Sequence, residues 1–160
     1  MTTETTASTR VEVSVEVEAP IARAFEVFTA EIGTWWSPDH HILQADLKEM
    51  VFEPRAGGYV YDVGVDGSEC RWARVLAYEP PHGVVFSWDI SLAWQIETDP
   101  ARTSEVQVRF VEVGAARTRV VVEHKHLDRH GDGWEQMRDA VGSPDGWGKG
   151  LAAFAARAAA

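Results

Sequence analysis

Apolar and polar residues alternate strictly over residues 11–18, which predicts a strand with its valines on one face. Pro20 then suits the first turn of a helix over 20–31, in which Ile21 and Phe25 begin an apolar face at helical spacing. Further alternating segments, bounded by Pro, Gly and Asp-Gly turns, predict a run of antiparallel strands. These strands are expected at 46–53, 59–65, 69–78, 84–90, 103–113 and 117–127.

Two helical segments complete the chain. Residues 134–141 fit one helix, Gly142 ends it, and Ser143 is placed to cap the second. Apolar residues recur along the second segment at Trp147, Leu151, Phe154 and Ala158. A long antiparallel sheet curls and must cover its concave face, and only this last helix is large enough to do so. We therefore predict an α+β fold: a curled antiparallel sheet of about seven strands around a long C-terminal helix, with two short helices after the first strand.

The length of 160 residues indicates a single domain, expected over 10–160, after a polar N-terminal tail over 1–9 that we expect to be disordered. The tail lacks the apolar region of a signal peptide and Cys70 is the only cysteine, so a cytoplasmic protein without disulfides is expected. No apolar run is long enough to insert into a membrane. The net charge of −10 argues against binding to nucleic acid or to anionic lipid surfaces.

Seven tryptophans are the most unusual part of the composition. Trp35 and Trp36 are adjacent, so one indole is expected to pack in the core and the other to lie at a cavity or its rim. The inward-facing positions of the expected strands and helix predict a ligand-binding pocket. Its lining is predicted as Trp36, Tyr59, Tyr61, Trp72, Phe86, Trp88, Phe110, His124, Trp147 and Leu151. The alternative is that these side chains simply fill the core.

Polar candidates are few. His124 is expected to be a polar anchor in the pocket, or else a hydrogen-bonded core histidine, and to share its strand face with His126. Arg74 is expected to be a second anchor, or to pair with one of the nearby carboxylates Glu53, Asp62 and Asp89. The pair His40-His41 lies near the expected mouth. No converging set of metal ligands, catalytic triad or phosphate loop is recognisable, so no metal, cofactor or catalytic residue is predicted.

The order of elements, taken with a set of local segments, resembles the helix-grip, START-like (SRPBCC) superfamily. Within it, the chain is most similar to the bacterial branch related to the C-terminal domain of the heat-shock-protein-90 ATPase activator. The matching segments are 17–28, Trp35-Trp36, 53–59, 72–81, Ser87-Trp88, 104–110, 118–120, Glu123-His124 and Gly146-Trp147. The resemblance implies a curled sheet that grips the C-terminal helix and encloses a cavity. It implies no single activity.

Four hypotheses for the function stay open. The first is a non-enzymatic protein that binds a small hydrophobic, aromatic or polyketide-like molecule. The second is an enzyme of the aromatase/cyclase kind, in which a histidine or arginine assists proton transfer. The third is a protein-interaction module of the chaperone-activator kind, with a protein partner or a homodimer, which predicts a closed core and an exposed apolar patch. The fourth comes from relatives that resist enediyne antibiotics by sacrificing their own backbone.

Overall fold

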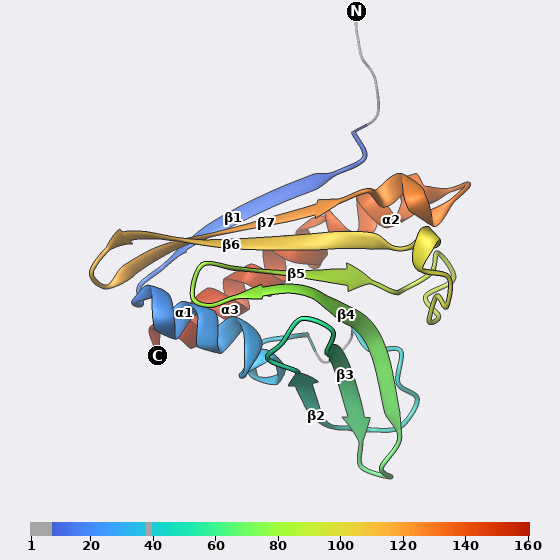
Figure 1. Cartoon of the computed structure of the whole chain (residues 1–160), viewed down its shortest axis with the longest axis horizontal. Coiled ribbons are helices and arrows are strands. Elements are labelled where there is room, and N and C mark those ends of the chain that lie inside the picture. Colours follow the sequence, from blue (N-terminus) through green and yellow to red (C-terminus); the bar gives the residue numbers. More distant parts are fainter. Residues whose placement is uncertain (1–7, 38–39) are drawn as a thin grey trace, which may run out of the picture.

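The computed structural model describes residues 8–37 and 40–160 (Figure 1). Most of the expected N-terminal tail therefore lies outside the described residues, although the carbonyl of Thr9 accepts a hydrogen bond from the Leu127 amide at 3.0 Å. The strands are β1 (Val11–Val17), β2 (Leu47–Phe52), β3 (Tyr59–Gly64), β4 (Glu69–Glu79), β5 (Gly83–Trp88), β6 (Ser104–Gly114) and β7 (Arg117–Lys125). The helices are α1 (Ile21–Thr29), η1 (Ile32–Thr34), η2 (Pro100–Arg102), η3 (Leu127–His130), α2 (Trp134–Val141), η4 (Pro144–Gly148) and α3 (Lys149–Ala159).

The seven strands form one sheet in the order β1-β7-β6-β5-β4-β3-β2. Every neighbouring pair is antiparallel. The sheet curls, and α2 and α3 run across one of its faces (Figure 1). This arrangement confirms the predicted α+β helix-grip fold, including the long C-terminal helical segment and the short helices α1 and η1 after the first strand.

Aromatic side chains join the helices to the sheet. Phe25 and Phe28 on α1 pack edge-on against Phe110 of β6, with ring centroids 5.1 and 5.8 Å apart. Phe28 also contacts Phe154 of α3 at 5.4 Å. All four rings are at most 5% exposed, so this cluster fixes the helices against the concave face at one end of the molecule.

Two register shifts in β4 decide which side chains face inward. Between β3 and β4, Val60 pairs with Ala73 but Tyr61 pairs with Arg71, which leaves Trp72 as an extra residue. A second shift lies between β4 and β5, where Val75 pairs with Phe86 and Ala77 with Val85, so that Leu76 is an extra residue of β4. A bulge moves the following side chains to the opposite face. Trp72 is therefore buried inside and Arg74 lies on the outer side, whereas simple alternation had placed both on one face.

β7 ends two residues earlier than predicted. The strand stops at Lys125, and His126 has a left-handed backbone with φ of 61°. His126 therefore begins the turn into η3 and does not share a strand face with His124, so the expected pairing of these two side chains is wrong.

The C-terminal helical segment bends at Gly146, whose φ of −88° and ψ of −128° are not helical. Ser143 precedes the bend, but its hydroxyl donates to the Ala140 carbonyl at 2.8 Å and does not cap the next helix, contrary to expectation. The backbone of residue 146 approaches the end of α2 so closely that a Cβ there would lie 2.2 Å from the carbonyl oxygen of Val141. Glycine is therefore required at this position.

Candidate functional site

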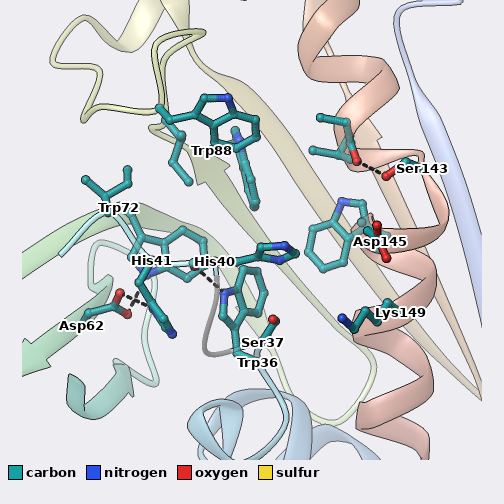
Figure 2. Close-up of a pocket in the computed structure, with 18 of the residues that line it drawn as sticks. Trp36, Ser37, His40, His41, Asp62, Trp72, Trp88, Ser143, Asp145 and Lys149 are labelled. Atoms are coloured by element: carbon teal, nitrogen blue, oxygen red, sulfur yellow. Dashed lines mark hydrogen bonds and ion pairs between the residues drawn. The ribbon is translucent and has the colours of Figure 1, made fainter. Parts of the chain in front are cut away.

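A cavity of about 450 Å³ lies between the sheet and the C-terminal helices (Figure 2). This volume is within the range typical of small-molecule sites. Its lining comes from the segment after η1, from β3, β4 and β5 with the loop that follows, and from α2, η4 and α3. Six of the seven tryptophans border it: Trp35, Trp36, Trp72, Trp88, Trp94 and Trp147.

The adjacent tryptophans divide as the sequence predicts. Trp35 is 4% exposed, its indole N–H donates to the Val27 carbonyl at 2.9 Å, and its ring packs on Phe28 and Phe154. Trp36 is only partly buried and reaches the cavity. The bond from Trp35 back to α1 therefore fixes the start of the segment that carries Trp36.

Trp36 stands at the centre of the indole cluster. Its ring centroid lies 5.0 Å from that of Trp72, 5.8 Å from that of Trp147 and 6.4 Å from that of Trp88. The contacting rings come from the sheet and from the C-terminal helical segment, so the cluster forms only when the two are packed together. Such a wall offers flat apolar surfaces suited to stacking on an aromatic ligand.

One corner of the cavity is polar. Asp62 of β3 is 1% exposed, and its carboxylate lies 2.7 Å from Nδ1 of His41, whose side chain is 9% exposed. The other oxygen of Asp62 accepts a hydrogen bond from the Trp72 indole N–H at 3.2 Å. Figure 2 shows these three side chains together at one side of the cavity. The sequence drew attention to His41 through its place in the His40-His41 pair, but did not predict its pairing with Asp62.

His124 is fully buried behind the indoles and does not border the cavity. The indole N–H of Trp147 donates to its Nδ1 at 3.2 Å, and its Nε2 lies 2.8 Å from the hydroxyl of Ser104. That hydroxyl also lies 2.8 Å from Nε2 of His130. Because Nδ1 of His124 accepts, the neutral ring carries its hydrogen on Nε2, and the Ser104 hydroxyl then donates to His130.

Burial, and secondarily repulsion from His130, lowers the pKa of His124 to about 3. Burial also lowers the pKa of His130. Both rings are therefore neutral near pH 7. His124 is a hydrogen-bonded core histidine that holds Trp147 in place, which was the alternative to its expected role as an anchor facing the ligand.

The remaining predicted lining residues lie elsewhere. Phe86, Phe110 and Leu151 are at most 3% exposed within the core. Tyr59 and Tyr61 alternate with the inward-facing Val60 and Asp62, so their rings lie on the other side of β3, near the guanidinium of Arg71 at 4.8 and 5.7 Å. The alternation of β3 alone does not decide which of its faces is buried, and in the structure the buried face carries Val60 and Asp62 and not the two tyrosines.

Arg74 pairs with Asp89, one of the three carboxylates named from the sequence. The two form a bidentate pair, with both N–O distances at 3.0 Å, and Arg74 also donates to the Thr103 hydroxyl at 3.2 Å. This ion pair raises the pKa of Arg74, so its charge is retained. Arg74 is not among the residues that border the cavity.

The rim of the cavity carries Ser37, His40, Asp145 and Lys149 (Figure 2). Among residues 8–37 and 40–160, no group of three or more His, Cys, Asp or Glu side chains is arranged to hold a metal ion. In the same part of the chain, no helix is long and apolar enough to cross a membrane.

Comparison with known proteins defines the family. The profile of the family described as "Activator of Hsp90 ATPase homolog 1-like protein" matches residues 18–159. The chain belongs to this family. The resemblance recognised in the sequence is thereby confirmed. None of the curated proteins compared with the chain matches it.

Solved structures with the same fold include proteins with named activities. An anthrahydroquino-γ-pyrone synthase, Txn09, complexed with SUM, is 39% identical, with a TM-score of 0.65 over 92% of this chain and 95% of that one. The self-sacrificing resistance protein CalC from Micromonospora echinospora is 27% identical, with a TM-score of 0.65 over 94% of each chain. A protein from Arthrobacter aurescens, 19% identical, shares the fold with a TM-score of 0.64 over 94% of this chain and 86% of that one.

Proposed function

We propose that this protein binds a planar aromatic, polyketide-type molecule in the tryptophan-lined cavity. The observation that carries the proposal is the convergence of six indoles on one cavity of about 450 Å³. Stacking between flat rings adds to the stabilisation from burying apolar surface. A polar corner at His41 and Asp62 would orient such a ligand, as the few polar groups of apolar pockets usually do.

The similarity to Txn09 supports the same ligand class. Txn09 is an anthrahydroquino-γ-pyrone synthase that is 39% identical to this chain, and an anthrahydroquinone fused to a pyrone is a flat polycyclic aromatic compound. The alternative of a protein-interaction module predicted a closed core, whereas this fold holds a cavity. The expected protein partner or homodimer stays a prediction that these observations do not favour.

A cyclase activity is the second candidate, and the pairing of His41 with Asp62 favours it. A histidine held by a carboxylate at the wall of an apolar cavity can act as a general base. Closing a pyrone ring requires a hydroxyl or enol oxygen to form a C–O bond, and removal of its proton promotes that step. Binding is common to both candidates and is therefore tested first.

The test is tryptophan-fluorescence titration with 1,2-dihydroxyanthraquinone, a flat tricyclic probe. We expect saturable quenching by the wild-type protein. Trp36→Leu removes the central indole of the cluster and should weaken binding about fivefold, because an aromatic contact contributes about 1 kcal/mol beyond its buried area. Trp134→Leu is the matched control, since Trp134 stacks near Arg138 on α2 and does not border the cavity. Absence of quenching, or equal weakening by both variants, contradicts the proposal.

A further inference from the structure

Asp62 is placed to hold the ring of His41 and is not free to contact a ligand itself. One of its oxygens accepts the Trp72 indole N–H at 3.2 Å and the other lies 2.7 Å from Nδ1 of His41. Asp62 lines the cavity as His41 does, but only 1% of its side chain is exposed and both of its oxygens already have partners. Its effect on a bound molecule is therefore expected to pass mainly through the imidazole of His41, which borders the same cavity.

The contact with Asp62 also decides which ring nitrogen of His41 carries hydrogen. An ionised carboxylate only accepts hydrogen bonds, so Nδ1 donates and the neutral ring presents a lone pair at Nε2. Nε2 is buried and has no hydrogen-bond partner among the residues that the structure describes. A buried polar atom without a partner is unfavourable, and a ligand group that donates to it would remove that cost.

A second unpartnered polar atom belongs to the same cavity wall. The indole N–H of Trp88 is buried and, within the described residues, has no acceptor. This group can only donate, whereas Nε2 of His41 can accept. The two atoms therefore have complementary requirements, which a molecule carrying both a hydroxyl and a carbonyl oxygen on an aromatic frame could satisfy.

We propose that the cavity selects hydroxylated aromatic carbonyl compounds and that Nε2 of His41 accepts the proton of the ligand's acidic hydroxyl. The proposal rests on the proposed function and specifies its ligand class. The O–H bond breaks, the proton passes to Nε2, and the electron pair stays on the ligand oxygen as a bound phenolate. Asp62 stabilises the resulting imidazolium through Nδ1. Nε2 is covered by protein atoms, so the ring or its neighbours must shift slightly as the hydroxyl approaches.

The experiment compares 1,2-dihydroxyanthraquinone with its 1,2-dimethoxy analogue, which has the same ring frame but no hydroxyl proton. The dissociation constants are measured by tryptophan quenching. Visible absorption shows whether the bound dihydroxy dye is ionised, at a pH at which the free dye is not. We expect the wild-type protein to bind the dihydroxy dye about tenfold more tightly and to give the long-wavelength band of its anion. His41→Phe should lose both the preference and the band.

Two further variants make the assignment specific. Asp62→Asn nearly preserves volume, but its amide can donate to Nδ1 and move the ring hydrogen to Nε2, so dye should still bind without the anion band. His82→Phe alters a histidine that does not border the cavity, and should keep both the preference and the band.

The outcomes separate the two proposals. If neither dye quenches the tryptophan fluorescence of the wild-type protein, the proposed function is wrong, and the proposed role of His41 as proton acceptor is wrong as well. If both dyes bind the wild-type protein equally and no anion band appears, the cavity binds aromatics but His41 is not the proton acceptor. Loss of the preference in His82→Phe, with retention in His41→Phe, would also overturn the assignment.

Discussion

Gly146 and Gly148 lie two residues apart at the start of the last helix, yet alanine should have opposite effects at the two positions. A Cβ on residue 146 would lie 2.2 Å from the carbonyl oxygen of Val141 and 2.6 Å from that of Ala140. Both obstacles are backbone atoms of α2, which cannot rotate away as a side chain can. A Cβ on residue 148 meets nothing within 4 Å, and the backbone there is α-helical, with φ of −58° and ψ of −49°.

These distances set the expected magnitudes. Overpacking a tightly packed site costs about 1–3 kcal/mol, and two backbone clashes place Gly146→Ala at the upper end, about 3 kcal/mol. For a chain of this size, that loss lowers the melting temperature by about 6–12 °C. Gly148→Ala gains helix propensity of about 1 kcal/mol, which raises the melting temperature by about 2–4 °C. The two variants should therefore differ by about 4 kcal/mol in the free energy of unfolding.

Urea and thermal unfolding followed by circular dichroism measure both variants. The dihydroxyanthraquinone titration adds a second readout, because Gly146 borders the cavity beside Trp147. Gly146→Ala should weaken binding, since α2 and η4 must move apart to admit the methyl group. A Gly146→Ala protein as stable as the wild type would refute the steric reasoning. A Gly148→Ala protein that is less stable than the wild type would refute the description of that position as open.

Two further predictions concern groups outside the cavity. The pKa of His124 is about 3 in the folded protein, against an ordinary value of 6.5 for histidine. Between pH 3 and pH 6.5 the unfolded chain therefore binds more protons than the folded one, so the free energy of unfolding should fall as the pH drops from 6.5 toward 3. Urea unfolding should show a slope of up to about 1.4 kcal/mol per pH unit from this group, and an equal slope in His124→Gln would contradict its assignment. Arg74→Met breaks the pair with Asp89 and should cost about 1–2 kcal/mol of stability, allowing for partial solvent exposure, without changing dye affinity. Reduced affinity at unchanged stability would instead make Arg74 a ligand anchor.

The fold was predictable because its elements are encoded locally. The alternation of apolar and polar residues located the ends of strands β1 to β7 to within a few residues. Pro20 and Gly142 marked helix boundaries. The burial of Trp35 in the core and the position of Trp36 at the cavity followed from side-chain size alone, since two adjacent indoles cannot enter the same core space.

The candidate site was only partly predictable, because bulges and turns change which face a side chain occupies. Trp36, Trp72, Trp88 and Trp147 border the cavity as expected. Arg74 does not, because the extra residue at Trp72 reverses the alternation of β4 after that point. No pattern of hydrophobicity reports such an insertion, since it depends on the pairing with β3.

Sequence alone determined the order of the elements, the wealth of tryptophan and the need to cover one face of a curled sheet, because each follows from local periodicity and composition. Tertiary structure alone decided that His41 meets Asp62, 21 residues further along the chain, and that His124 turns its nitrogens to Trp147 and Ser104. Such contacts join distant segments through single hydrogen bonds. Their geometry is set only when the sheet, the segment after η1 and the C-terminal helices pack together.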